Sequence, residues 1–360
     1  MKSLLTKTCL TLIALATLTS TANAYTISTA CGSNIRWTSG AVTMRMSSVT
    51  FPAGDAARTP VIQARQAWNN GPVDFSMSFN WGDSSVSVGN LQNEVWATTS
   101  DYWLSGAPAV AVSWRSCAAR TESDVIIDAD RTWNFGTSMS NNMAYAGGSR
   151  SLQSVTIHEF GHVLGLGHES STYNVMGQDW DHVHLNNGAV SFYAGEDAAH
   201  GAIQLYGSVG ASDLSVVHWR RTGSSGGYST HAWTRVKNAT TGATYGSFDN
   251  TDGYRVYLVP HGQTVALELS FENNGRNNRT PLVWYVLSTN DYITTADTLL
   301  ATRTPTLGRN TVYTTDQDLT LPSTLTKGTV YYLGAVVDPN NTITEWDEGN
   351  NATPVAIMPY

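Results

Sequence analysis

The stretch from His158 to His168 constrains this chain more than any other feature. It reads HEFGHVLGLGH, in which three histidines, a glutamate and a glycine follow the spacing H-E-x-x-H-x-x-G-x-x-H. His158 and His162 are four residues apart, so on a helix they share one face and lie about 6 Å apart. Both imidazoles can then bind one tetrahedral metal ion. Gly165 can end the helix because glycine adopts the left-handed cap conformation without steric cost, and His168 can return as the third ligand.

These residue types predict a catalytic zinc site rather than a structural one. Structural zinc sites are normally closed by four protein ligands, often cysteines, whereas three histidines leave one position for water. Glu159 lies about 100° around the helix from His158, which is too far to be a ligand but well placed to accept a proton from a zinc-bound water. We therefore expect one Zn²⁺ held by His158, His162 and His168, with Glu159 as the catalytic base.

The first 24 residues have the parts of a secretory signal peptide. Two lysines precede an apolar run over residues 10–16, and Ala22-Asn23-Ala24 is a small-x-small cleavage site. The run is too short to span a bilayer, and no other segment approaches the length of about 18 apolar residues that a transmembrane helix needs. We therefore expect a secreted, extracellular chain that starts at Tyr25 and has no transmembrane span.

Charge and cysteine content add to this expectation. Loss of the signal peptide removes two lysines and no acids, which changes the formal charge from −8 to −10. Such an acidic chain argues against a nucleic-acid partner. Cys9 leaves with the signal peptide, and in an oxidising compartment the remaining Cys31 and Cys117 are expected to form one disulfide. The alternative is that Cys31 is a thiolate that blocks the zinc in a latent form.

The length and the patterning predict two domains. Removing 24 residues from 360 leaves about 336, too many for one compact core of ordinary size. Strand and helix patterns mix up to residue 207, whereas beyond residue 212 short alternating strands are separated by turn residues. We place the first domain at residues 25–207, a linker at 208–212 and a β-sandwich at 213–360.

Hydrophobic periodicity predicts the main elements. In the first domain it indicates strands at residues 42–46, 75–79, 110–114 and 124–127 and helices at 59–69, 152–164 and 196–205. Thr59 is expected to cap the first helix, with Pro60 in its first turn. In the second domain strands are expected at 213–217, 264–269, 282–287 and 330–337. The Gly/Ser/Thr-rich stretch 222–252 does not fit a compact sandwich.

Met176 follows His168 by eight residues, and with it the long histidine motif resembles the metzincin clan of zinc endopeptidases. In that clan a methionine turn lies beneath the metal, which gives Met176 a structural role at the site. The resemblance covers residues 40–207 and implies an α+β fold with a twisted mixed sheet, a zinc helix and a C-terminal helix. It also implies that the substrates are proteins or peptides.

Within the clan, the strand at 124–127, the approach to the zinc helix at 153–157 and the ending at 195–207 are most similar to bacterial matrixin-type domains of the peptidase M10 type. Glu169, directly after the third histidine, gives the chain some astacin-like character. Astacins, however, have a tyrosine where Gln178 stands. The family pattern therefore does not identify the residue that assists zinc in stabilising the oxyanion.

The chain from about residue 254 to 355 resembles the bacterial CARDB domain, an adhesion-related, immunoglobulin-like domain. The residues that carry the resemblance are Asn273-Asn274-Gly275, 287–290, 297–300, 337–340, Glu345 and 348–351. This resemblance implies an all-β immunoglobulin-like sandwich. Such a domain could hold an extracellular polymer or a cell surface.

Two functions follow as alternatives. The first is a secreted zinc endopeptidase, and the second is a surface-binding adhesin whose protease-like domain is not catalytic. The intact Glu159 favours the peptidase, because a binding protein needs no proton acceptor.

Other residues of the first domain give weaker indications of a metal or substrate site. His182 and His184 could bind a second metal, but a loop that shapes the substrate pocket, lined by Trp180 and Tyr193, is the favoured interpretation. Calcium is possible but unsupported, since the stretch around Asp128 and Asp130 lacks the ligands of a full calcium loop.

Overall fold

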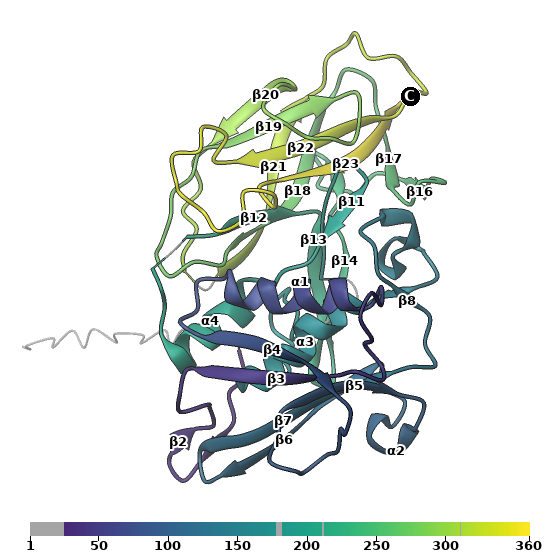
Figure 1. Cartoon of the computed structure of the whole chain (residues 1–360). Coiled ribbons are helices and arrows are strands. Elements are labelled where there is room, and N and C mark those ends of the chain that lie inside the picture. Colours follow the sequence, from purple (N-terminus) through teal and green to yellow (C-terminus); the bar gives the residue numbers. More distant parts are fainter. Residues whose placement is uncertain (1–24, 178–181, 211, 310) are drawn as a thin grey trace, which may run out of the picture.

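The computed structural model describes residues 25–177, 182–210, 212–309 and 311–360. The expected signal peptide, Gln178 and Trp180 lie outside these residues. Figure 1 shows three layers, with a sheet at the bottom, the helices α1, α3 and α4 in the middle, and the strands of the C-terminal half above them. Within the described ranges, no helix is both long enough and apolar enough to pass through a bilayer.

A mixed sheet forms the floor of the N-terminal half, in the order β4-β3-β5-β7-β6. Its strands are β3 (Ala41–Ser47), β4 (Ser76–Asp83), β5 (Glu94–Thr98), β6 (Ala109–Ser116) and β7 (Ala119–Asp128). All neighbours pair in parallel except β6 and β7, which form an antiparallel hairpin. In β3, Val42, Met44 and Met46 are buried and alternate with exposed residues, as the period of a strand requires. The strands expected in this half are therefore confirmed.

Strand β5 lies in the middle of this sheet and was not predicted. Its sequence Glu-Val-Trp-Ala-Thr begins with three buried residues, so it shows no alternation of apolar and polar side chains. Strands that are covered on both faces lack the period-2 signal on which a sequence-based assignment depends.

The helices are α1 (Arg58–Asn69), α2 (Asp101–Leu104), α3 (Leu152–Leu164) and α4 (Glu196–Tyr206). The expected cap at Thr59 is wrong, because α1 starts at Arg58 and has no side-chain cap. The Asp55 carboxylate instead accepts a hydrogen bond from the backbone N–H of Ala57 at 2.8 Å, and this turn starts the helix earlier than expected. Pro60 does lie in the first turn, where its missing N–H is tolerated.

The C-terminal half consists of strands. One sheet contains β12 (Leu214–Val217), β15 (Val236–Asn238), β18 (Thr264–Asn273) and β21 (Thr311–Thr320). The other has the order β16-β17-β23-β22-β19-β20, with bounds Ser247–Asp249, Arg255–Val259, Ala352–Pro359, Tyr331–Val337, Val283–Ser288 and Thr298–Arg303. Leu267 and Phe271 of the first sheet share a core with Tyr285 and Leu333 of the second. The all-β prediction is confirmed, while the immunoglobulin-like topology and the metzincin topology stay predictions.

Short elements complete the fold. They are β1 (Thr29–Ala30), β2 (Ser33–Asn34), β8 (Trp133–Asn134), η1 (Met139–Asn141), η2 (Met143–Tyr145), β9 (Arg150–Ser151), β10 (His184–Asn186) and β11 (Ala189–Ser191). A hairpin of β13 (Trp219–Ser225) and β14 (Tyr228–Trp233) forms a sheet of its own. It contains part of the stretch 222–252 that the sequence could not place, and in Figure 1 it descends from the C-terminal half toward the helices.

The two halves share a hydrophobic core. Val217, Trp219 and Val256 of the C-terminal half belong to the same buried cluster as the helices and sheet of the N-terminal half. The expected linker is held at both ends, because Ser208 pairs with Val73 and Ser212 pairs with Glu345. The described ends of this segment are therefore attached to both halves through Ser208 and Ser212.

Cys31 and Cys117 form the expected disulfide, which joins positions 86 apart in the sequence. The bridge ties the N-terminal segment to the turn between β6 and β7. Because both sulfurs are in this bond, the alternative that Cys31 blocks the zinc as a thiolate is wrong.

Replacing both cysteines with serine should lower the free energy of unfolding by about 2–4 kcal/mol, because the bridge restricts the unfolded chain. Urea denaturation of the oxidised wild type and of the double variant measures this difference. A reducing agent should destabilise the wild type by a similar amount and leave the double variant unchanged. A wild type that is insensitive to reduction would contradict the prediction.

Candidate metal centre

Helix α3 runs over the predicted residues 152–164, and its ends explain why. The Ser151 side chain accepts a hydrogen bond from the backbone N–H of Ser154 at 3.2 Å, which satisfies one of the free donors of the first turn. At the other end Gly165 has φ +114°, a conformation that favours glycine. A Cβ at this position would also lie 2.7 Å from the Ile35 carbonyl oxygen. The chain therefore leaves the helix where the motif predicts.

The structure brings the three predicted ligands together. The Nε2 atom of His162 lies 3.1 Å from that of His158 and 3.1 Å from that of His168. Each of the three imidazoles can offer one ligand atom, and these atoms lie within 4.8 Å of one another. Among the described residues, this is the group of histidine, cysteine or acidic side chains that could hold a metal ion.

The protonation of the imidazoles fits a zinc ion. The Nδ1 atom of His158 lies 2.7 Å from the Val175 carbonyl oxygen, and that of His162 lies 2.8 Å from the Leu166 carbonyl oxygen. A carbonyl oxygen only accepts, so both Nδ1 atoms carry the proton and both Nε2 atoms present a lone pair. Two lone pairs 3.1 Å apart repel each other unless a cation lies between them. In a tetrahedral zinc site neighbouring ligand nitrogens lie about 3.4 Å apart, close to this separation.

Burial keeps these imidazoles neutral. It lowers the pKa of His158 to about 4, and it lowers the pKa of His162 well below the usual value, with a further contribution from the neighbouring His158. Neutral imidazole is the form that binds a metal. The two helical histidines are thus held in the protonation state and the tautomer that zinc requires.

Glu159 lies beside the ligands. Its side chain is buried, and it lines the same cavity of about 500 Å³ as the three histidines. Residues 107–111, Arg150 and Tyr228 form the remaining wall. The cavity thus combines a metal-ligand set with a carboxylate that can accept a proton.

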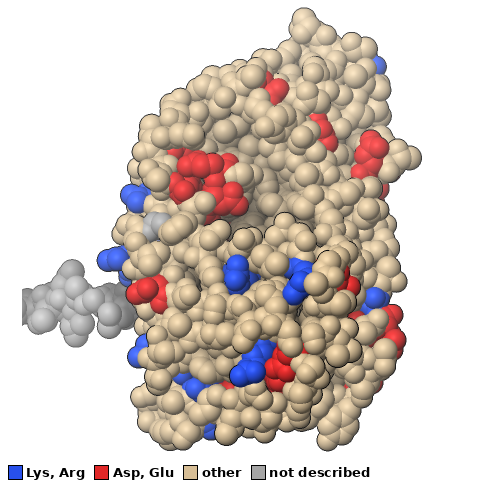
Figure 2. All heavy atoms as spheres, viewed as in Figure 1, with Lys and Arg blue, Asp and Glu red and all other residues tan. Residues whose placement is uncertain are grey.

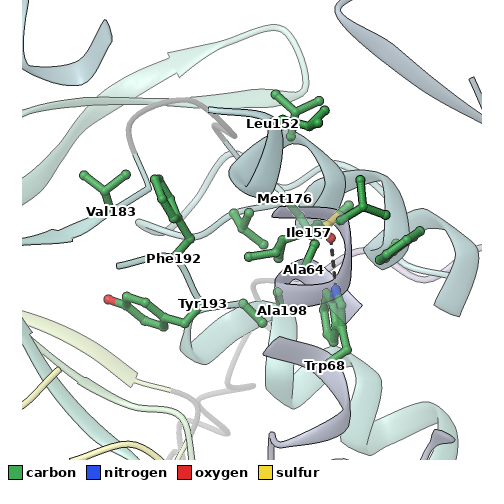
Figure 3. Packing of buried hydrophobic residues seen from close by; sticks show 14 of the residues in the cluster. Ala64, Trp68, Leu152, Ile157, Met176, Val183, Phe192, Tyr193 and Ala198 are labelled. Atoms are coloured by element: carbon green, nitrogen blue, oxygen red, sulfur yellow. Dashed lines mark hydrogen bonds between the residues drawn. The ribbon is translucent and has the colours of Figure 1, made fainter. Parts of the chain in front are cut away.

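Met176 packs against Gly161 of α3 and is 1% exposed. A Cβ added at Gly161 would overlap the Met176 sulfur and would lie 3.2 Å from the Trp68 ring. Figure 3 shows Met176 close to Ile157 and Ala64, and the Trp68 indole donates a hydrogen bond of 3.0 Å to the Ile157 carbonyl oxygen. These contacts fix the helix segment that carries His158 and His162.

His182 and His184 do not join the metal centre. The His184 Nε2 atom lies 2.7 Å from the Ala352 carbonyl oxygen, and the buried His182 ring packs 4.4 Å from Tyr173 and 4.9 Å from Tyr193. The second-metal interpretation therefore has no support in the described residues. Asp128 pairs with Arg131 at 3.0 Å in an ordinary turn, so the calcium interpretation gains no support either.

Tyr193 does not line the cavity of the histidines, contrary to the prediction. It is buried and lines a separate cavity of about 430 Å³ between α1 and the C-terminal half, together with Asp213 and Asp347. Figure 2 shows acidic side chains gathered beside a hollow between the two halves. Tyr193 is absent from the wall of the histidine cavity because its ring packs against the buried His182.

Tyr228 was missed by the sequence analysis. Its ring centroid lies 4.3 Å from that of His168, and its hydroxyl lies 3.3 Å from the His168 Nε2 atom. The two residues are 60 positions apart, and Tyr228 lies in a stretch with no recognisable pattern. No local signal in the sequence could have placed it at the metal centre.

Comparison with known proteins shows two family matches. Residues 36–207 match the matrixin model, and residues 255–355 match the CARDB model. Among solved structures, the chain is similar to a crystal structure of a CARDB domain from Pyrococcus furiosus in complex with di-metal ions (18% identity, 42% of this chain, 90% of that chain, TM-score 0.26). A solution structure of a CARDB domain from the same organism is also similar (20% identity, 41% of this chain, 96% of that chain, TM-score 0.24).

No curated protein matches the chain. The matrixin match includes the metal-ligand helix, and the CARDB match includes strands β17 to β22. The β13–β14 hairpin lies between the two matches, with β12, β15 and β16. The protein therefore joins a matrixin domain, residues 36–207, to a CARDB domain, residues 255–355.

Proposed function

We propose that this protein is a secreted zinc endopeptidase that hydrolyses peptide bonds of extracellular proteins. One observation carries the proposal: the His162 Nε2 atom lies 3.1 Å from those of His158 and His168 in the cavity that Glu159 also lines. The matrixin domain supports it, because that family suggests a zinc metallopeptidase. We assign the metal to His158, His162 and His168 and the catalytic base to Glu159.

Zinc bound there supplies a Lewis acid that lowers the pKa of water and stabilises negative charge on a carbonyl oxygen. The Glu159 carboxylate accepts the proton of the attacking water and passes it to the leaving amine. The imidazoles stay oriented because His158 donates to the Val175 carbonyl and His162 to the Leu166 carbonyl.

The substrate chain has a place to bind. Strand β6 is at the edge of the five-stranded sheet, and residues 109–111 at its start line the cavity beside the histidines. An edge strand presents unpaired backbone N–H and C=O groups, to which an extended peptide can add as a further strand. This supports an endopeptidase, because such binding needs no free end of the substrate.

Changing Glu159→Gln or Glu159→Ala should lower casein hydrolysis by about 10²- to 10⁴-fold, because the proton acceptor is lost. Zinc stoichiometry should stay near one, since the three imidazoles are intact. Metal analysis and a casein assay on the same preparations measure both quantities. The mechanism is wrong if either variant cleaves casein at the wild-type rate.

Changing His158→Ala should remove both metal and activity, because two imidazoles bind zinc much more weakly than three. The zinc content should fall well below one equivalent. His261→Ala is a matched control, since His261 lies in the C-terminal half, where its Nε2 atom is 2.8 Å from the Leu325 carbonyl oxygen. A chelator should abolish cleavage by the wild type. If the zinc-loaded wild type cleaves neither casein nor gelatin, the adhesin alternative replaces the peptidase.

We also propose that the chain is exported and cleaved after Ala24. Tyr25, the expected first residue of the mature protein, packs against α4, with its ring 5.4 Å from that of His200. The CARDB domain is of a cell-surface-like kind, and binding of an extracellular polymer or a cell surface stays a prediction.

N-terminal sequencing of protein collected from the culture medium should therefore begin at Tyr25-Thr26-Ile27. Material that retains the first 24 residues, or that stays inside the cell, would contradict export through this signal.

A further inference from the structure

The β13–β14 hairpin, residues 219–233, leaves the sheets of the C-terminal half and packs on the N-terminal half. It lies between the two family matches, which end at residue 207 and begin at residue 255. Neither family therefore accounts for it.

An aromatic cluster anchors the base of the hairpin. The rings of Trp219 and Trp233 lie 5.1 Å apart, and the His218 ring stacks on Trp233 at 4.9 Å. Tyr145 of the N-terminal half packs on Trp233 at 5.4 Å, and its hydroxyl lies 3.0 Å from the His218 Nε2 atom. Stacked and tilted rings at these distances each stabilise the contact by about 1 kcal/mol beyond burial. The base is therefore fixed to the N-terminal half.

The arms of the hairpin contact the loop that follows the third histidine. Arg221 donates a hydrogen bond to the Ser170 carbonyl oxygen at 2.7 Å, and the His231 ring lies 4.5 Å from the Tyr173 ring. A Cβ on Gly177, next to Met176, would overlap the Ser229 hydroxyl. The hairpin thus covers the loop from the third ligand to the methionine turn.

The tip of the hairpin reaches the metal cavity. Ser225 pairs with Tyr228 across the two-residue turn Gly226-Gly227, and Gly226 has φ +61°, as tight hairpin turns favour. Tyr228 is therefore the first residue after the turn. Its ring lies on His168, and its hydroxyl is 3.3 Å from the nitrogen that faces the other two ligands.

The cavity wall contains few side-chain donors. His158 and His162 already donate through Nδ1 to backbone carbonyls. Apart from the histidines, only Tyr228 and Arg150 of the described lining residues carry a side-chain N–H or O–H group. Of these two, Tyr228 has its donor at the ligand cluster. A phenol there can donate to an oxygen that also lies next to the metal.

We propose that Tyr228 is a catalytic residue of the peptidase, supplied by the hairpin outside both families. Its hydroxyl donates a hydrogen bond to the scissile carbonyl oxygen as that oxygen gains negative charge. The water oxygen bonds to the carbonyl carbon, the carbon–nitrogen bond then breaks, and the proton that Glu159 took from water passes to the amine. Tyr228 keeps its own proton throughout. This inference rests on the proposed peptidase function.

The first test compares Tyr228→Phe with the wild type, because phenylalanine keeps the ring on His168 and removes only the hydroxyl. We expect kcat to fall by about 10²-fold, the typical effect of losing one donor to an oxyanion. KM should change by less than about threefold, and zinc stoichiometry should stay near one. Tyr292→Phe is the control, since Tyr292 lies in a loop of the C-terminal half and is 52% exposed.

The second test measures binding rather than turnover. A phosphinic peptide carries a tetrahedral, negatively charged phosphorus centre that resembles the hydrated carbonyl of the substrate. Calorimetric titration of the zinc-loaded proteins should show that Tyr228→Phe weakens its binding by about the same factor as it lowers kcat. Tyr292→Phe should bind it as tightly as the wild type.

Each other outcome overturns the assignment. Wild-type kcat and wild-type phosphinate affinity in Tyr228→Phe would show that the hydroxyl takes no part. Loss of zinc from Tyr228→Phe would show that the phenol is a metal ligand. Increased activity of this variant would show that the hydroxyl hinders substrate hydrolysis. If the zinc-loaded wild type cleaves no peptide, the proposed function fails and this inference fails with it. Wild-type cleavage with an unaffected Tyr228→Phe rejects only the role of Tyr228.

Discussion

The metal centre depends on two hydrogen bonds that fix the tautomers of His158 and His162. Each Nδ1–H donates to a backbone carbonyl, of Val175 and Leu166 respectively, and each Nε2 lone pair therefore faces the other at 3.1 Å. Such an arrangement is repulsive in the bare protein and favourable around a cation. The fold holds this geometry because both carbonyls belong to chain segments that the helix end and the methionine turn keep in place.

The packing around the helix follows from that requirement. Gly161 leaves the space that the Met176 sulfur fills, and the carbonyl next to Met176, that of Val175, is the one that orients His158. Trp68 packs on the same glycine and bonds to the Ile157 carbonyl, so α1 holds α3 from the other side. A larger residue at position 161 would displace the methionine and, with it, the partner of His158. The spacing of the motif in this chain is thus explained by contacts, since the ligand, the glycine and the methionine depend on one another.

Sequence patterns predicted well what depends on neighbouring residues. The ends of α3 follow from the Ser151 cap and from Gly165, and the ligand set follows from the helical period. Sequence patterns missed the features that depend on contacts between residues far apart in the sequence. Strand β5 is buried between β3 and β7 and so shows no alternation, and Tyr228 reaches His168 only through a hairpin 60 residues away. Thr59 was misplaced because the backbone turn at Asp55, rather than the best capping residue, starts the helix.

The two halves of the chain are joined by a shared core rather than by a linker alone. The sequence predicted a first domain, a short linker and a β-sandwich. In the structure, Trp219 and Val256 of the C-terminal half lie in the core of the N-terminal half. The hairpin then extends from that shared core to the loop after His168, so the C-terminal half fixes part of the cavity wall. Residues buried in one cluster unfold together more readily than residues joined by a tether, because separating them exposes apolar surface. The metal cavity is therefore complete only when both halves are folded against each other.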